Sequence, residues 1–523
     1  MAEIGGSITA TELGARTAKA ASFLVFGRVL SGLVAVVMFV AIARLLQPEG
    51  YGLYTLAIAV SGFVGSFAIP SLGVYFNRNI PLNLAKKKRH TIRVAVGDGI
   101  LLILAATAVL AAIGALLAAP ISKMVFGGMH LFLLDVAFLY VISSSVYMFF
   151  YSVLLSFGKG EYVSAMQLTN SIFQGATSIG LILLGFGALG AASGMVLGSI
   201  AASIVGIVCL RSQGGASFRI DGMRERMREM LAFTLPLAAS GIMGSAISNF
   251  SVILLGLLIV PVSLIGQYGV ASRISVLVDI ISGSLTIFLI PMFTTALHGK
   301  KTKGRLSQLY SYSLYYGALF TLPMIAYISI LSKYLVEGVF TLAYKNVIVY
   351  MPLVSIGLFI GIAWSYAYSL VVSMGDTRQV LKYSMITSAA EMVSLFLLTP
   401  ILHVMGVIIS LLYVGNIASL LLYLHRIRGT GIRSSNRQFP RLVISSILLS
   451  VAMLPILASN TSPLAALLLG AAEVFSIYPI LVGITGAISR QEISTLRAMV
   501  SGIPIAGVAI LPFLSYARIF CRR

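Results

Sequence analysis

The sequence has few of the residues on which most enzymes and secreted proteins depend. Its 523 residues include two cysteines, Cys209 and Cys521, which excludes a disulfide framework and a cysteine-based metal cluster. Only 10% of the residues are charged, and aspartate and glutamate together number 15. The motifs H-E-x-x-H, G-x-S-x-G, C-x-x-C and the P-loop are all absent. We therefore expect no metal site and no cofactor, and nothing in the sequence argues for an enzyme.

Apolar residues are abundant instead. They make up 59% of the chain, and the mean hydropathy is +1.01, which is more apolar surface than a soluble protein can bury. The first apolar run begins near Phe23, is too long for a signal-peptide core and has no convincing cleavage site. We therefore expect a membrane protein that retains this run as its first span.

About fourteen apolar stretches are long enough to cross the membrane, because about 20 residues of helix span the hydrocarbon core. A further stretch at 498–515 contains Pro504 and Pro512, and we expect it to lie at the surface rather than to form a fifteenth span. The expected spans are 23–43, 51–76, 93–119, 131–156, 163–187, 190–210, 230–259, 263–293, 307–331, 346–373, 379–401, 404–424, 441–458 and 463–488.

Loops with many basic residues alternate along the chain with loops that have few. With the N-terminus in the cytoplasm, 31 of the 36 lysines and arginines fall on the cytoplasmic side, four fall outside, and Arg273 lies within a span. Cytoplasmic loops of membrane proteins carry such an excess, which explains the net charge of +21 without a nucleic-acid partner. We expect a multi-pass protein of the cell membrane with a cytoplasmic N-terminus.

Several short motifs recur about 210–217 residues apart. "LLSFGKG" around Gly158 resembles "VVSMGDT" around Gly375, and "KKKR" at Lys86 resembles "KKTK" at Lys300. The simplest physical role of Gly158 and Gly375 is that each ends a helix. The recurrence predicts two six-helix units in the same orientation, followed by two extra spans. The expected parts are a cytoplasmic tail (1–22), an N-lobe (23–211), a basic linker (212–229), a C-lobe (230–427), spans 13 and 14 (428–488) and a C-terminal tail (489–523).

Duplicated bundles in one membrane are typical of transporters, in which two halves move about a site between them. "GFGALG" at Gly185 fits the dinucleotide pattern G-x-G-x-x-G but lies between two apolar spans, so we expect only a turn there. Gly190, Gly194 and Gly198 continue at a spacing of four, which predicts close helix packing.

Acidic residues within the spans are candidates for ion coupling, because a charge at mid-bilayer costs about 2.5–3.5 kcal/mol and needs a partner, water or a function. Hydrogen bonding between helices is the alternative role for each of them. The candidates are Asp98, Asp279, Glu391 and Glu473.

Basic and amide residues within or near span ends are candidates for binding a substrate. Arg28 and Arg78 lie at cytoplasmic span ends, where a guanidinium can bind two phosphate oxygens, and anchoring at the membrane surface is their alternative role. Arg273 lies inside the eighth span and faces either a cavity or another helix. Asn77 and Asn249 are polar residues that can assist.

The arrangement of spans as 6 + 6 + 2, with "FVAIARLLQPEGYGLYTLAIAV" joining the first two, resembles the polysaccharide flippases of the multidrug/oligosaccharidyl-lipid/polysaccharide exporter superfamily. "GQYGVASRISVLVDIISGSLTIFLIP" is similar to the eighth span of that family and places Arg273 where the family has a basic residue. The resemblance covers the chain to about residue 490. It implies an all-α polytopic membrane protein with a MATE-like exporter fold.

The resemblance also implies an activity. Such a flippase moves a lipid-linked oligosaccharide from the cytoplasmic to the outer leaflet, with Arg28, Arg78 and Arg273 as the expected contacts of the pyrophosphate. The expected partners are this substrate, membrane lipids, a coupling proton or sodium ion if one is used, and the glycan assembly machinery. A cation-coupled multidrug exporter is the first alternative, although the first span has Arg28 and no acid. A membrane glycan polymerase or ligase is the second, although the large charged outer loop of such enzymes is missing.

Overall fold

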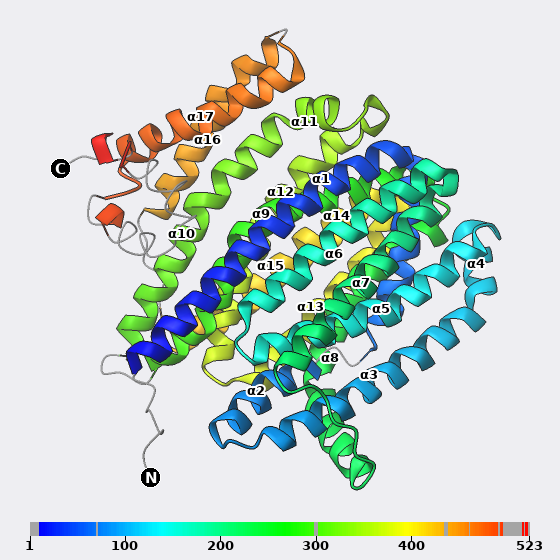
Figure 1. Ribbon diagram of the computed structural model, residues 1–523. Helices are drawn as coiled ribbons and strands as arrows, with labels where there is room; N and C mark the ends of the chain where they lie inside the picture. Colours follow the sequence, from blue (N-terminus) through cyan, green and yellow to red (C-terminus); the bar gives the residue numbers. More distant parts are fainter. Residues whose placement is uncertain are drawn as a thin grey trace. The chain divides into compact units, whose positions relative to one another are not determined.

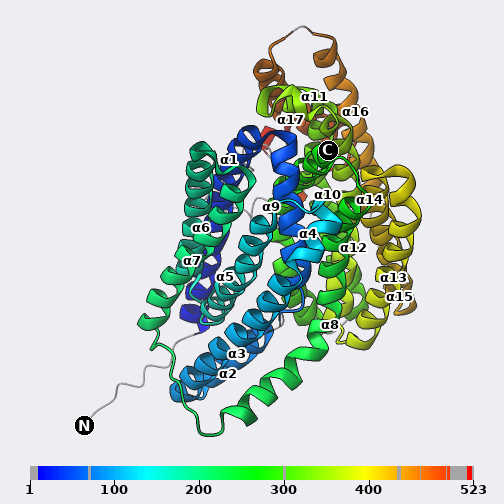
Figure 2. The same ribbon diagram turned by 90° about the vertical axis from the view of Figure 1, so that its right-hand side faces the viewer.

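The computed structural model describes residues 10–68, 72–297, 302–432, 438–459, 461–489, 492–494, 515–516 and 518–520. Every regular element in these ranges is helical (Figures 1 and 2). Among the described residues, ten helical stretches are long and apolar enough to cross a membrane, and two of them, Leu30–Gly65 and Gly160–Ser212, each extend over most of two expected spans. The prediction of an all-α multi-pass membrane protein is confirmed. The stretch 498–515 lies, except for its last residue, outside the described part of the chain.

The chain divides into two compact units. Unit 1 comprises Met1–Leu46 and Leu53–Leu257, and unit 2 comprises Gln47–Gly52 and Leu258–Arg523. The boundary therefore falls after the seventh expected span, whereas the sequence places the lobe boundary at 212–229. The expected division into an N-lobe (23–211) and a C-lobe (230–427) therefore stays a prediction.

Unit 1 is built around α5, which packs on α2, α3 and α7, while α6 and α7 form a close pair. Its helices are α1 (Ala10–Gly65), α2 (Leu72–Ala85), α3 (Arg89–Leu116), α4 (Ala118–Phe126), α5 (Leu131–Ser156), α6 (Gly160–Leu181), the π-helical η1 (Ile182–Phe186), α7 (Gly187–Ser212) and α8 (Met223–Leu257).

Unit 2 is built around α12, which packs on α9, α10 and α15, and α16 joins α10 to α17. Its helices are α9 (Val262–Leu297), α10 (Thr302–Ile330), α11 (Ser332–Val339), the 3₁₀ turn η2 (Leu342–Tyr344), α12 (Val347–Ser373), α13 (Thr377–Leu402), α14 (Val404–Ile408), the π-helical η3 (Ile409–Gly415), α15 (Asn416–Gly429), α16 (Phe439–Ala458) and α17 (Pro463–Ile484).

Helix α1 covers the first expected span and most of the second. A kink at Gln47, with φ 56° and ψ 172°, separates the two, because the following Pro48 has no N–H to continue the hydrogen-bond ladder. The helix begins at Ala10, within the stretch expected to be a tail. It ends at Gly65, so the second span is interrupted before α2 begins at Leu72 instead of continuing to residue 76.

The same order of elements occurs in both units. A long helix is followed by a short one in α3–α4 and again in α10–α11, and a π-helical segment occurs in η1 and again in η3. Gly158 and Gly375 follow the ends of α5 and α12 with φ of 70° and 78°. The prediction that each glycine ends a helix is confirmed, and the recurring elements agree with a duplicated six-helix plan.

The predicted turn at 185–190 and the close helix packing after it are also confirmed. Gly185 and Gly187 have positive φ at the turn between α6 and α7. A Cβ at Gly194 would overlap Ser178 Oγ, and one at Gly198 would lie 2.6 Å from Gln174 Cβ. Only glycine allows the two backbones to approach this closely.

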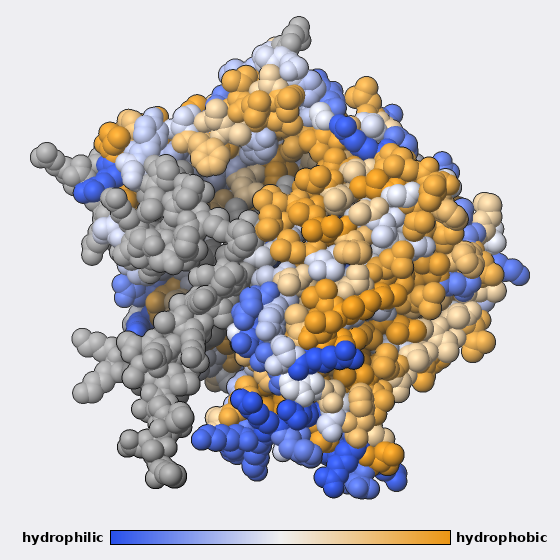
Figure 3. Space-filling view, in the orientation of Figure 1, coloured by the Kyte–Doolittle hydropathy of each residue, from blue (hydrophilic) through white to orange (hydrophobic). Residues whose placement is uncertain are grey.

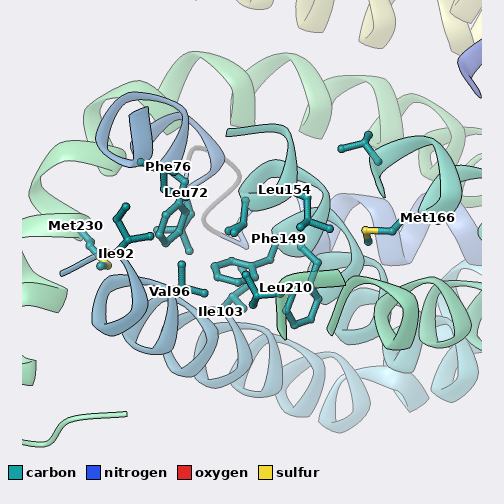
Figure 4. Close-up of a cluster of buried hydrophobic side chains, with 14 residues drawn as sticks. Leu72, Phe76, Ile92, Val96, Ile103, Phe149, Leu154, Met166, Leu210 and Met230 are labelled. Atoms are coloured by element: carbon teal, nitrogen blue, oxygen red, sulfur yellow. The ribbon is translucent and has the colours of Figure 1, made fainter. Parts of the chain in front are cut away.

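A hydrophobic cluster holds α2, α3, α5 and α7 of unit 1 together. Figure 4 shows Phe76, Ile92, Phe149 and Leu210 converging from these four helices. Met230 of α8 belongs to the same cluster. Burial of such side chains fixes the ends of these helices relative to one another.

Apolar side chains also face outward, as lipid-facing helices require. Figure 3 shows them spread over the face of α5, α6 and α7, with hydrophilic side chains gathered at the end where α2 and α3 meet. The exposed residues on these three helices and on η1 between α6 and α7 include Leu139, Met148, Ile172, Phe173, Leu183, Leu184, Leu197, Ile204 and Val208.

Candidate functional site

Unit 1 contains a cavity of about 670 Å³ between its helices. No charged side chain lines it; hydroxyl groups of serine and tyrosine and several glycines share the wall with apolar side chains. The lining residues are Ser61, Gly62, Gly65, Ser66, Ala68, Leu72, Gly73, Ile103, Tyr140, Val141, Ser144, Ser145, Tyr147, Met148, Phe149, Tyr151, Ser152, Asn170, Ser199, Gly241 and Ser245.

Serine hydroxyls can line this wall because of how serine behaves on a helix. Ser144 Oγ donates to the Tyr140 carbonyl at 2.6 Å, one turn back on α5, so the hydroxyl is satisfied without water. Ser199 Oγ of α7 lies 3.0 Å from Ser143 Oγ, which joins α7 to α5. The cavity can therefore offer serine hydroxyl oxygens to a ligand as hydrogen-bond acceptors.

Three of the five predicted substrate contacts lie next to residues of this cavity. Arg28 interacts electrostatically with the hydroxyl of Tyr151, which lines the cavity. Asn249 Nδ2 donates to the carbonyl of Ser245, a lining residue, at 2.8 Å. A Cβ at Gly62, which also lines the cavity, would overlap Asn249 Oδ1, so the amide occupies the space beside that glycine.

Asn77 reaches the same region through α5. Its Oδ1 accepts a hydrogen bond of 2.6 Å from Ser156 Oγ, one turn beyond the lining residue Ser152. A Cβ at Gly73 would lie 2.6 Å from Ser152 Oγ, so α2 and α5 approach closely at this point. Asn77 itself is exposed.

Arg78, the next residue, is engaged elsewhere. Its guanidinium carbon lies 5.2 Å from the ring centroid of Phe233 on α8. That ring packs edge-on against Tyr75 at 5.8 Å. A cation over an aromatic face is attracted to it, so this contact ties α2 to α8.

Asp98 is completely buried on α3 and is paired. Arg226 Nε donates to its Oδ2 at 2.5 Å, and Arg226 Nη2 donates to its Oδ1 at 3.2 Å. The same guanidinium donates to the carbonyls of Arg219 and Asp221. The pairing satisfies the carboxylate and connects it to the basic segment before α8.

Arg273 lies in unit 2, on α9. Its guanidinium is hydrogen-bonded to the hydroxyl of Tyr51, a buried residue of the segment Gln47–Gly52 that belongs to the same unit. Tyr344 of η2 interacts electrostatically with Tyr51 as well. Asp279 lies on the same helix, and its side chain is outside the described part of the structure.

The remaining acidic candidates lie on α13 and α17. A Cβ at Gly415 would overlap Glu391 Oε1, so this carboxyl group packs directly on the π-helical segment η3. Local π-helix often marks a functional position. Glu473 Oε2 is buried and has no hydrogen-bond partner among the described residues.

The sequence alone did not identify the cavity wall, Tyr51 or Arg226. The run Ser143–Ser145 on α5 was the available signal for the wall, since three serines in an apolar span are unusual. Tyr51 lies in the Pro-Glu-Gly-Tyr-Gly turn that the sequence singled out for its family resemblance. Arg226 looked like one of many basic linker residues, and only the fold brings it to Asp98.

A bundle of membrane-spanning helices with a cavity lined partly by hydroxyl groups is typical of a membrane transporter. The chain belongs to the polysaccharide biosynthesis protein family, because the model of that family matches residues 17–297. A search of curated proteins found no match.

Solved structures give the fold. The "Lipid II flippase MurJ, inward closed conformation" is similar with a TM-score of 0.69 and 15% identity, over 88% of this chain and 98% of that chain. A mutant of the Vibrio cholerae MATE transporter VcmN has a TM-score of 0.53 and 17% identity, over 80% and 98%. The MATE multidrug transporter DinF-BH has a TM-score of 0.55 and 16% identity, over 82% and 98%. The predicted family and the MATE-like exporter fold are confirmed.

Proposed function

We propose that this protein is a flippase that moves a lipid-linked oligosaccharide from the cytoplasmic to the outer leaflet of the cell membrane by alternating access. The observation that carries the proposal is the uncharged, hydroxyl-rich cavity of unit 1 with Arg28, Asn77 and Asn249 next to it. Hydroxyl and amide groups match the hydroxyls of sugars, and an arginine matches a pyrophosphate. The polyprenyl chain needs no such wall, because it stays in the lipid.

The family match and the likeness to a lipid II flippase support transport of a glycolipid. Arg78 and Arg273 are further proposed contacts of the pyrophosphate. The membrane orientation follows from the basic residues, with the N-terminus in the cytoplasm. Asp279, Glu391 and Glu473 are the proposed groups for coupling to a proton or sodium ion, and Asp98 is the fourth candidate, already paired with Arg226.

The cavity wall also bears on the multidrug alternative. A cationic drug is held best by a carboxylate, and no lining residue of this cavity has one. The wall therefore favours the hydroxyl-rich glycan part of a glycolipid over a cationic drug, and the glycan assembly machinery is the expected source of the glycolipid.

The proposal is tested by depleting the protein from cells and measuring lipid-linked oligosaccharide that remains accessible on the cytoplasmic side. We expect accumulation on depletion, cured by the wild type but not by Ser145→Phe, which fills the cavity. Ser476→Phe is the matched control, because Ser476 is exposed on α17 and lines no part of the cavity. Unchanged glycolipid pools in a strain without a second flippase would overturn the proposal.

A further inference from the structure

A second cavity, of about 420 Å³, lies in unit 1 where α2 ends, α3 begins and α7 ends. It shares no lining residue with the cavity described above. Its lining residues are Leu84, Arg89, Ile92, Arg93, Phe157, Arg211, Ser212, Gln213, Gly214 and Gly215. Three of the ten are arginines and none is acidic.

The three arginines converge without a carboxylate to neutralise them. Ion pairs among the described residues of unit 1 include Lys159–Glu161, Arg219–Asp221 and Arg226–Asp98, and Arg89, Arg93 and Arg211 take part in none of these three. Like charges held around one cavity repel one another. An anion with several oxygens relieves that repulsion, and guanidinium groups bind such an anion with paired hydrogen bonds.

Helix α3 adds to the positive potential of this cavity. Arg89 is its first residue, its first turn has no acidic residue, and no side chain caps it. Its first N–H groups and its dipole therefore favour an anion at the same end of the cavity as Arg89.

The backbone opposite α3 allows the arginines to approach. Gly214 has a φ of 112°, and a Cβ there would lie 2.8 Å from Arg93 Nε, so the guanidinium of Arg93 rests directly on this glycine. The N–H groups of Gly214 and Gly215 already bond to carbonyls at the end of α7. On this side of the cavity, a ligand therefore meets guanidinium groups rather than these two N–H groups.

The cavity is held in shape by the segment that follows it. Ser217 N–H donates to the Arg93 carbonyl at 2.9 Å. Arg226 donates to the carbonyls of Arg219 and Asp221 while it is fixed by the buried Asp98. Ile92 and Leu210, which precede Arg93 and Arg211 in the chain, belong to the hydrophobic cluster of unit 1 (Figure 4). A preformed site loses less conformational entropy when it binds.

The surroundings place the cavity at the membrane surface. Phe218 and Ile220 are 61% and 86% exposed on the segment that begins at the cavity, although both are apolar. Exposed apolar side chains beside a cationic cluster are typical of the interface, where the apolar groups enter the lipid and the basic groups meet phosphates.

We propose that this cavity is a phosphate-binding site in which Arg89, Arg93 and Arg211 hold a phosphate group, either of a lipid headgroup or of a soluble phosphate compound. The site is separate from the cavity assigned to the glycolipid, and binding to it is measured without transport. A negative result in this binding test would therefore leave the proposed function unaffected.

The test measures the unfolding midpoint of the purified full-length protein in detergent as a function of added ligand. The ligands are dioctanoyl phosphatidic acid, dioctanoylglycerol, which differs from it only by the phosphate, and inorganic phosphate. The pocket variant is Arg89→Gln/Arg93→Gln/Arg211→Gln. The matched control is Lys86→Gln/Lys87→Gln/Lys88→Gln, which removes the same charge from exposed residues that do not line the cavity.

We expect phosphatidic acid to stabilise the wild type and the control, and the pocket variant to need about tenfold more of it, because charge-assisted bonds to the phosphate are lost. Stabilisation by inorganic phosphate that is lost in the pocket variant supports the same site with a soluble ligand. Equal responses of the two triple variants, or equal stabilisation by dioctanoylglycerol, would overturn the proposal. If the pocket variant does not fold, Arg211→Gln alone is used, since Arg211 is exposed in the last turn of α7.

Discussion

Gly266 of α9 lies so close to Pro48 that a Cβ at position 266 would overlap the Pro48 carbonyl oxygen. Gly52 makes the reciprocal contact, because a Cβ there would overlap the carbonyl oxygen of Val262. Both glycines come from motifs that the sequence singled out, "EGYG" and "GQYG". Their role is to let the segment Gln47–Gly52 lie backbone to backbone on α9 within unit 2.

Replacing Gly266 by alanine should therefore destabilise the protein. The added methyl group meets a backbone atom that cannot turn away, and overpacking of this kind costs about 1–3 kcal/mol. The measurement is the unfolding midpoint of the purified protein, followed by far-ultraviolet circular dichroism. Gly304→Ala is the control, because a Cβ there meets nothing within 4 Å, and its midpoint should be unchanged or slightly higher. Equal midpoints for the two variants would show that the contact is looser than described.

The pair Asp98–Arg226 predicts a larger effect on stability. Arg226→Gln leaves the fully buried carboxylate without its partner, and breaking a buried ion pair in this way costs about 3–5 kcal/mol. The double variant Asp98→Asn/Arg226→Gln should recover part of that loss, since no buried charge remains. Arg219→Gln removes only an exposed pair of 3.9 Å and should cost under about 1 kcal/mol. A double variant no more stable than Arg226→Gln would contradict this account.

The direction of the pKa shift of Arg226 determines how its contribution to stability depends on pH. The hydrogen bond to Asp98 raises the pKa of the Arg226 guanidinium above its ordinary value. A raised pKa means that the stabilisation is present at all lower pH values and is lost only as the pH rises through the pKa of the folded state. Arg226 therefore stays charged across the physiological range, and its contribution to the unfolding midpoint, measured as the difference between wild type and Arg226→Gln, should not vary there.

Helix positions were predictable because membrane thickness fixes how long an apolar run must be. The runs at 131–156 and 346–373 correspond to α5 and α12 almost residue for residue, and Gly158 and Gly375 end them because only glycine readily adopts the positive φ. The π-helical segments η1 and η3 have no comparable signature in an apolar sequence and were not expected.

The groups around the candidate site were less predictable, because their partners are remote in the chain. Asp98 and Arg226 are 128 residues apart, and nothing in either local sequence indicates the other. The cavity of unit 1 depends on where α1, α5 and α8 leave space between them, which only packing decides. The sequence identified Arg28, Asn77 and Asn249 by residue type. The fold places Arg28 and Asn249 next to lining residues and Asn77 one helical turn from Ser152, and their role in binding stays a prediction.

The α6–α7 pair gives a prediction about helix packing in lipid. Gly194→Ala places a methyl group on Ser178 Oγ and 2.6 Å from Ser178 N, so the helices must separate, at a cost of about 1–3 kcal/mol. Gly180→Ala on α6 is the control, since a Cβ there meets nothing within 4 Å. The unfolding midpoint should fall for Gly194→Ala alone. If both variants have the same unfolding midpoint as the wild type, the close approach of α6 and α7 is not needed for stability.

The geometry around Arg28 and Arg78 separates their expected effects on transport. Arg28 interacts with Tyr151 on the cavity wall, whereas Arg78 rests on Phe233 and fixes α2 to α8. In an assay of glycolipid flipping by the reconstituted protein, Arg28→Gln should lower the rate about tenfold, because a charge-assisted contact with the pyrophosphate is lost. Arg28→Lys should keep part of the rate, since the charge remains without the planar fork.

Arg78→Gln should lower the rate less than Arg28→Gln does, and it should reduce stability by about 0.5–1 kcal/mol through the lost contact with the Phe233 ring. Lys123→Gln, on an exposed residue of α4, is the control for charge alone. A rate for Arg28→Gln equal to that of the control would remove Arg28 from the substrate path, while a larger loss for Arg78→Gln would move the pyrophosphate site to the α2–α8 side of unit 1.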